Sequence, residues 1–176
     1  MILSLYDITV PTLVGGLNSL QGVLDKAVAH VEAKKLDPRA LLDARLYPDM
    51  FAFQRQVQVV ADLARRGVDR LAGVEPASVP DEETTFTELS ARLASTLDHV
   101  KGADRAAIDA SVDREFTVNV GQTMTFTGRS YLLGFLLPNF LFHVTTAYDI
   151  LRHNGVELGK RGFIAPFVMA GMGAGR

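Results

Sequence analysis

His143 is the residue with the clearest capacity for chemistry in this sequence. It lies in a stretch of 19 residues, 130–148, that contains no Asp, Glu, Lys or Arg but does contain Asn139, four residues before the histidine. Buried polar groups need hydrogen-bond partners, so we expect Asn139 and His143 to be satisfied together inside the protein. An imidazole and an amide in otherwise apolar surroundings would form a polar pocket that could bind a small ligand.

The other residue types narrow the chemistry further. The chain has no cysteine and four histidines, which excludes a thiolate nucleophile, a disulfide framework and a cysteine-ligated metal. It has no Ser-His-Asp order, phosphate-binding glycine loop or dinucleotide-binding motif, so no residue is assigned a catalytic role. Asp7, Asp49 and Asp62 could each contribute a carboxylate to a pocket, and Asp62 shares a predicted helical face with Gln58.

The composition is that of one globular domain. Among 176 residues, 48% are hydrophobic and 22% are charged, and the formal net charge is −2. This balance provides no electrostatic surface for nucleic acid. The N-terminus lacks the basic segment of a secretory signal, and the polar residues of 130–148 favour a buried helix over a membrane span. We therefore expect a cytoplasmic protein without nucleic-acid or membrane partners.

Apolar residues that recur every three or four positions predict four long helices. The expected ranges, with a short helix after Asp37-Pro38 between the first two, are 10–34, 49–73, 86–101 and 129–153. Pro138 should kink the last helix or mark its true start. Long amphipathic helices with short connections are typical of bundles, so the predicted fold class is an all-α four-helix bundle.

Residues 115–127 follow a period of two instead. Phe116 and Val118 alternate with polar residues, as do Met124 and Phe126, which predicts a β-hairpin inserted before the last helix. A loop of three residues would pair Val118 with Met124 and keep both apolar sets on one face. A loop of two residues would put these sets on opposite faces, so we predict the longer loop.

The C-terminal segment shows no regular pattern. From Gly162 onward it is rich in Gly, Ala and Met. We expect it to be either a loose terminus or a strap over a partner. The chain is accordingly divided into a helical domain over 1–165 and a tail over 166–176.

The last predicted helix resembles the closing helix of the DinB/YfiT-like superfamily. Residues 143–156 have a histidine ahead of a Leu-Arg pair and then Gly-Val, at the spacing found in that superfamily. Further runs resemble an uncharacterised bacterial branch, a domain of unknown function: 5–11, 46–51, 83–86 and 139–143. The resemblance covers roughly residues 1–165. It implies a four-helix bundle of up-down-down-up connectivity that is often dimeric.

The resemblance also implies where a metal would bind. Many members hold a divalent metal through three histidines, and some are thiol-dependent transferases or isomerases. The corresponding positions here are His143, Asn139 and a residue near Gln56 to Gln58, so only one is a histidine. Amides are weak zinc ligands. We expect no cofactor, with weakly bound Zn²⁺ or Ni²⁺ at His143 as the alternative.

The sequence does not determine which residue of the second long helix lies next to His143. Gln58 fits the distance to the helix end better, whereas Gln56 fits the apolar face better. In either case the prediction is a degenerate metal site, in which the histidine is buried, neutral and hydrogen-bonded to an amide.

Three functional hypotheses follow. The first is an uncharacterised DinB-like protein with a degenerate metal site and a polar pocket around His143, not a conventional metalloenzyme. The second is a metal-assisted or thiol-dependent transferase or hydrolase that uses His143. The third is a module that binds a small ligand. We also expect a homodimer, because the superfamily is often dimeric and the last helix and tail are rich in apolar residues.

Overall fold

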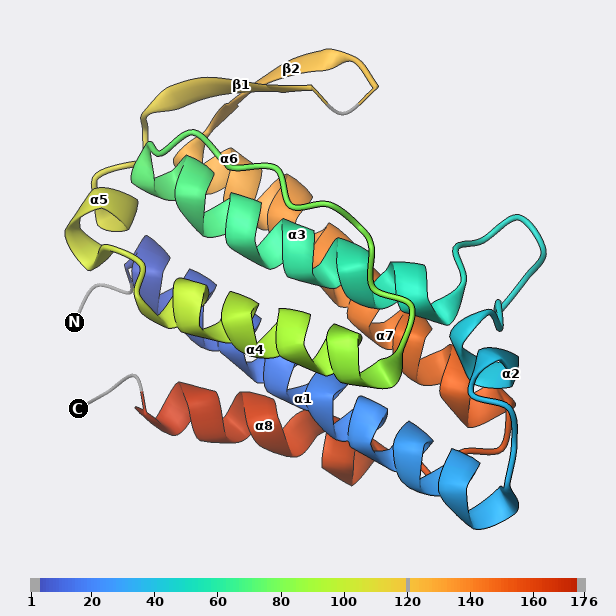
Figure 1. Cartoon of the computed structure of the whole chain (residues 1–176). Coiled ribbons are helices and arrows are strands. Elements are labelled where there is room, and N and C mark those ends of the chain that lie inside the picture. Colours follow the sequence, from blue (N-terminus) through green and yellow to red (C-terminus); the bar gives the residue numbers. More distant parts are fainter. Residues whose placement is uncertain (1–3, 120, 174–176) are drawn as a thin grey trace.

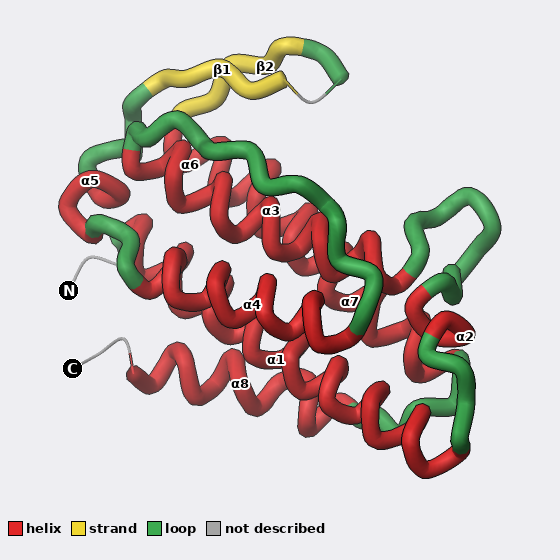
Figure 2. Tube along the Cα trace, in the orientation of Figure 1, coloured by secondary structure: helices red, strands yellow, loops and turns green. Residues whose placement is uncertain are grey.

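The computed structural model describes residues 4–119 and 121–173, most of which are helical (Figures 1 and 2). The helical segments are α1 (Leu5–Lys34), α2 (Arg39–Leu42), α3 (Phe53–Ala72), α4 (Phe86–Lys101), α5 (Arg105–Asp109), α6 (Gly128–Tyr131), the π-helical η1 (Leu132–Leu136), α7 (Leu137–His153) and α8 (Lys160–Gly173). Two strands, β1 (Glu115–Asn119) and β2 (Thr123–Thr127), form an antiparallel hairpin. Among these described helices, none combines the length and the apolar character that a membrane crossing requires.

Local signals in the sequence set the helix ends. Ser4 caps α1 by accepting a hydrogen bond from the backbone of Asp7. Thr85 and Glu88 form the expected capping box at the start of α4. Gly73 ends α3 with a φ of 78°, a left-handed conformation that only glycine adopts without strain.

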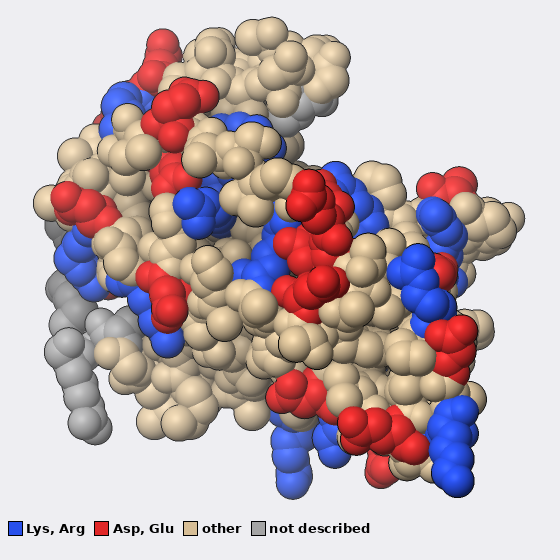
Figure 3. Space-filling view, in the orientation of Figure 1, with Lys and Arg blue, Asp and Glu red and all other residues tan. Residues whose placement is uncertain are grey.

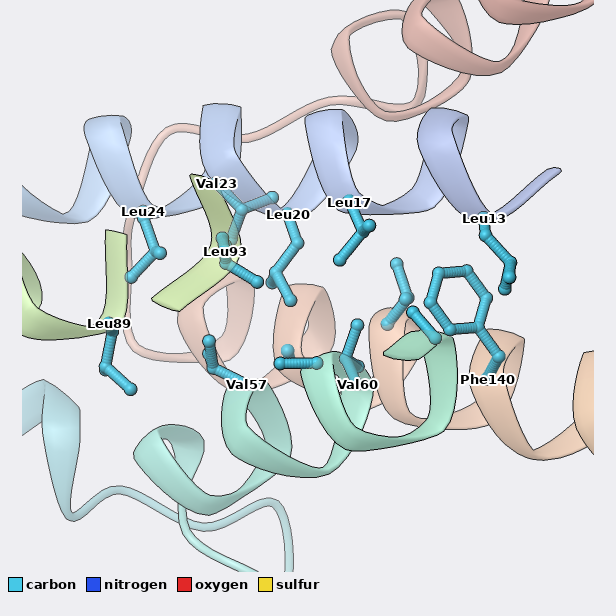
Figure 4. Packing of buried hydrophobic residues seen from close by; sticks show 14 of the residues in the cluster. Leu13, Leu17, Leu20, Val23, Leu24, Val57, Val60, Leu89, Leu93 and Phe140 are labelled. Carbon is cyan, nitrogen blue, oxygen red and sulfur yellow. The ribbon is translucent and has the colours of Figure 1, made fainter. Parts of the chain in front are cut away.

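The core lies where α1, α3, α4 and α7 meet (Figure 4). Each helix presents a stripe of apolar side chains, as the period in the sequence predicts. Members of this core include Leu13, Leu17, Leu20, Leu24, Val57, Val60, Leu89, Leu93 and Phe140. Full burial of one such side chain contributes about 2 kcal/mol relative to exposure, so this shared stripe provides most of the driving force that joins the four helices.

The chain takes a long path between α3 and α4. Residues 73–85 run back along α3, so that α3 and α4 point in the same direction (Figure 1). This connection crosses one face of the molecule and is held there by charged side chains described below.

The hairpin has the predicted register, although Val120 in its loop lies outside the described residues. The Cα partners include Phe116 with Phe126 and Val118 with Met124. Both phenylalanine rings contact the fully buried ring of Tyr131, with centroids 5.2 and 5.8 Å from it. A two-stranded hairpin is marginal on its own, so these aromatic contacts attach it to the helices.

The last predicted helix is continuous over 128–153 but not uniform. It consists of α6, the π-helical turn η1 and α7, with Pro138 within the first two positions of α7. Proline has no N–H to donate, so regular α-helical bonding cannot pass through it, and the wider turn precedes it. Pro138 therefore marks the start of a regular segment.

For the tail over 166–176 the sequence left open a loose terminus or a strap over a partner, and the structure shows a regular helix in place of a loose terminus. Residues 160–173 form the regular helix α8, which lies along α1 (Figure 1), and residues 174–176 lie outside the described part. Gly15 allows this close packing of α8, and Gly16 allows the close approach of α7. A Cβ on Gly15 would lie 2.7 Å from Cα of Phe167, and one on Gly16 would overlap the ring of Phe140. The surface that receives α8 is thus glycine backbone, which a search for apolar periodicity does not detect.

Candidate functional site

His143 and Gln56 meet at the contact between α7 and α3. The ring Nδ1 of His143 and the amide Oε1 of Gln56 are 2.6 Å apart. Gln56 is 1% exposed, and its neighbour Val57 is fully buried, so the apolar face of α3 carries the amide inward. His143 is half-buried. Of the two glutamines that the sequence left open, Gln56 is therefore the one that reaches the histidine.

The backbone of Phe51 determines how this amide is oriented. The Nε2 of Gln56 donates to the carbonyl oxygen of Phe51 over 3.2 Å. A carbonyl can only accept, so the amide NH₂ must face Phe51 and the amide oxygen must face the ring. That oxygen also can only accept, and consequently Nδ1 of His143 carries the proton. In the neutral ring, Nε2 is then left with a lone pair.

Two aromatic rings flank the imidazole. Phe51 stacks on it with centroids 6.4 Å apart and an interplanar angle of 20°, and Phe142 meets it edge-on at 5.1 Å. Burial lowers the pKa of His143 below its ordinary value of 6.5, and the positive charge of Arg55 lowers this pKa further. At neutral pH the ring is therefore uncharged. Its Nε2 has no hydrogen-bond partner among the residues that the structure describes.

Asn139 does not join His143, contrary to the expectation that the two are satisfied together. Its amide Nδ2 donates to the carbonyl oxygen of Phe135 in the preceding turn, at 2.7 Å. That carbonyl lies in the π-helical turn ahead of Pro138, where regular backbone bonding is interrupted. The amide of Asn139 is therefore bonded to the backbone of its own helix. The spacing of four residues between Asn139 and His143 wrongly suggested that the two side chains interact.

Gln58 and Asp62 belong to a second polar cluster. The Nε2 of Gln58 donates to a carboxylate oxygen of Glu83 over 3.1 Å, and Asp62 pairs with Arg92 of α4 at 2.7 Å. Arg92 also pairs with Asp81 at 3.1 Å and with Glu83 at 2.9 Å. Its side chain is only 5% exposed. We call these residues, together with Arg55, which pairs with Asp81, the Arg92 cluster.

The Arg92 cluster fastens the connection 73–85 to the helices. Arg92 donates to the carbonyl oxygen of Pro80 at 2.8 Å as well as to the carboxylates of Asp81 and Glu83. Figure 3 shows acidic and basic side chains gathered in the middle of this face. A cavity of about 390 Å³ adjoins the cluster and is lined in part by Asp62, Glu83 and Arg92. Tertiary packing brings these groups together from distant parts of the sequence, so no local sequence motif predicts the cluster.

The residues around His143 do not fit the three-histidine metal site that the family resemblance implies. The amide oxygen of Gln56 is occupied by the ring Nδ1, and the amide of Asn139 is turned to its own helix. Within residues 4–119 and 121–173, no three His, Asp or Glu side chains are placed to hold a metal ion. A transition metal at Nε2 would thus have one strong protein donor where three or four are usual.

Comparison with known proteins identifies the family. The chain is similar to a protein from Shewanella denitrificans whose crystal structure is described as that of a DinB family member, with 40% sequence identity and a TM-score of 0.82. The match covers 91% of each chain. The helical fold is therefore that of a DinB-like protein. Residues 5–164 match the family model DUF1993, a domain of unknown function, and the chain belongs to that family. A search of curated proteins finds no significant match.

Sequence reasoning missed several residues that the geometry makes important. Arg92 gave no signal, because a single arginine on an amphipathic helix is usually solvated. Phe51 supplies both a ring and a carbonyl to the His143 site, yet it precedes α3 in an irregular segment. His99, near the end of α4, gave no signal either, and its Nε2 lies 2.6 Å from a carboxylate oxygen of Asp69.

Proposed function

We propose that this protein binds a small organic ligand at His143 without a resident transition metal. The observation that carries this proposal is the chain of hydrogen bonds from Phe51 through Gln56 to the histidine ring. This chain fixes the proton on Nδ1 and leaves Nε2 as an acceptor. A buried amide that holds a neutral imidazole in one tautomer is well suited to recognise a hydrogen-bond donor.

The flanking rings define the rest of the ligand. Phe51 and Phe142 are 48% and 55% exposed, so both side chains offer apolar surface close to the imidazole. Aromatic side chains with free surface bind flat apolar groups. The matching ligand is therefore a small molecule with an apolar or aromatic body and one O–H or N–H donor. Burial keeps the pKa of His143 below its ordinary value, so the neutral ring can accept a hydrogen bond from such a group at neutral pH.

Phenol is a suitable probe, because it combines an aromatic ring with one hydroxyl donor. Nitrogen NMR of the wild-type protein should show a protonated Nδ1 and an unprotonated Nε2 at His143. Addition of phenol should shift the Nε2 resonance, whereas toluene, which lacks the donor, should not. Loss of one hydrogen bond corresponds to about tenfold in affinity. His143→Phe should therefore weaken phenol binding by about that factor.

The matched control is His153→Phe, at an exposed position near the end of the same helix. It should leave phenol binding unchanged. Equal binding of phenol and toluene, or equal loss in both variants, would show that the imidazole does not recognise the donor.

The metal-dependent alternative is tested on the same proteins. With a single strong donor at His143, zinc should bind no more tightly to the wild type than to His143→Phe. Stoichiometric zinc at micromolar concentration that is lost in His143→Phe would overturn the proposal. It would instead support a metal-assisted reaction.

We further propose that a second copy of this chain covers the outer face of α8. Four apolar side chains are exposed on this helix: Ile164 at 40%, Val168 at 53%, Met169 at 69% and Met172 at 71%. Residues 162–173 contain no charged residue. Two copies of the helix can therefore meet across a two-fold axis without opposing like charges.

Light scattering measures the oligomeric state directly. The wild type should be a dimer at micromolar concentration, and Val168→Glu should shift it to a monomer. Thr87→Glu, at an exposed position of α4, serves as the control and should remain dimeric. A monomeric wild type would refute the proposed contact.

A further inference from the structure

A groove runs between α3 and the hairpin, away from the residues assigned so far to ligand binding. It consists of two adjoining cavities of about 390 and 230 Å³. Both cavities are lined by Arg66, Arg70, Val118 and Asn119, so they lie next to each other along α3 beneath β1. Figure 1 shows the hairpin arching over α3 at this place.

One end of the groove carries unneutralised positive charge. Arg66, Arg70 and Arg114 line the larger cavity. Within the described residues, none of the three guanidinium groups forms an ion pair with a carboxylate. Glu75 also lines this cavity, so three positive charges face one negative charge. The surplus is positive and stays available to a ligand.

Two of these guanidinium groups are held in place by neutral oxygens. Arg70 donates to the hydroxyl of Tyr131 over 3.3 Å. Arg114 donates to the carbonyl oxygens of Arg70 and Leu71, each at 2.8 Å. These bonds position the planar groups without cancelling their charge. A positioned guanidinium loses less conformational freedom when it binds an anion, and its geometry matches a carboxylate or phosphate.

The other end of the groove adds apolar side chains beside Arg66 and Arg70. Val59, Leu63 and Phe135 line the smaller cavity. Its charged residues include Arg55 and Asp62, both of which are engaged in the Arg92 cluster. Arg66 and Arg70 line both cavities and Arg114 lines only the larger one, so the smaller cavity places hydrophobic surface next to the positive charge.

We infer that this groove binds an organic anion, with its carboxylate or phosphate group at Arg66, Arg70 and Arg114 and its apolar body along Val59, Leu63 and Phe135. The surplus charge selects the head group, and the hydrophobic walls select against a bare inorganic ion. This site shares no residue with the His143 site, so it stands whether or not His143 binds a ligand.

Calorimetric titration of the full chain tests this inference with three probes: hexyl phosphate, inorganic phosphate and hexanol. We expect hexyl phosphate to bind at least tenfold more tightly than inorganic phosphate. Any binding of hexanol, which has no charge for the arginines and could occupy the His143 site, should be the same in the wild type and in Arg66→Gln. Arg66→Gln removes an exposed charge and should weaken hexyl phosphate by about tenfold, which is one guanidinium contact. Arg129→Gln, at an exposed position of α6 outside the groove, should bind it like the wild type.

Three results would overturn the inference. Unchanged affinity in Arg66→Gln and in Arg70→Lys would show that the arginines do not hold the anion. Equal affinity for inorganic and hexyl phosphate would show that the apolar walls do not take part. Equal weakening by His143→Phe and Arg66→Gln would show that the probe binds elsewhere. Circular dichroism of each variant confirms that the fold is retained.

Discussion

Two polar clusters meet α3 at neighbouring residues, and they differ in what they leave unsatisfied. Gln56 turns toward His143 of α7, whereas Gln58, two residues later, turns toward Glu83 and the Arg92 cluster. In the Arg92 cluster one buried guanidinium is shared by three carboxylates. At the His143 site the chain of hydrogen bonds ends at a ring nitrogen that has no partner in the described part of the chain. Polarity alone therefore does not identify a binding site, and our proposal for His143 rests on the unused acceptor beside exposed aromatic rings.

The two clusters should also differ in how much stability they contribute. Arg92 is nearly inaccessible, so its removal leaves carboxylates that were paired and partly buried without a counter-charge. The His143 site contributes neutral hydrogen bonds, which are individually weaker. Four measurements test this contrast, and they are given from the largest expected effect to the smallest.

Arg92→Leu should lower the free energy of unfolding by about 3 kcal/mol, because it leaves several carboxylates without their partner. Urea denaturation measures this directly. Arg129→Leu is the matched control, since that side chain is exposed, and it should change stability by less than about 0.5 kcal/mol. Equal losses in the two variants would mean that the Arg92 cluster does not stabilise the fold.

Gln56→Leu should cost about 1–2 kcal/mol, because Nδ1 of His143 and the carbonyl of Phe51 both lose their partner. The same substitution should allow the proton of the neutral ring to occupy either nitrogen, which nitrogen NMR detects. Gln54→Leu, on the same helix, should leave the proton of His143 on Nδ1. A ring that stays protonated at Nδ1 in Gln56→Leu would contradict the role given to the amide.

Acid should produce a smaller effect that is specific to His143. Its pKa is below 6.5 in the folded protein, so below pH 6.5 the unfolded chain binds the proton more readily. Stability from this group is fully present above pH 6.5 and is lost as the pH falls toward the pKa of the folded state. Unfolding measured against pH should show this decline in the wild type, and the decline should be shallower in His143→Phe. Parallel curves would exclude a depressed pKa at this residue.

Asn139→Ala should have the smallest effect, about 0.5–1 kcal/mol, because it removes one partly exposed hydrogen bond to the backbone. It should leave the NMR signals of His143 in place. A changed tautomer at His143 in this variant would show that the two residues are coupled after all, and it would restore the pairing that the sequence suggested.

Periodicity and capping predicted the elements well because those signals are local. The capping box at Thr85 and Glu88 and the pairing of Phe116 with Phe126 depend on residues close in the sequence, and both are present. The site was harder to predict, because its members are brought together by packing between distant segments. Apolar periodicity favoured Gln56 correctly, whereas spacing favoured Asn139 wrongly, since a nearby carbonyl in an irregular turn competes for its amide.

The close packing of α8 against Gly15 of α1 determines how short the chain can be and still remain soluble. Phe167 rests against Gly15, and the family model ends at residue 164. A protein cut before Lys160 would keep α1, α3, α4 and α7, yet it would leave an open apolar furrow along the first helix. Such a shortened chain should retain the contact between His143 and Gln56. It should nevertheless precipitate, because α8 covers apolar surface of α1 that would then be exposed.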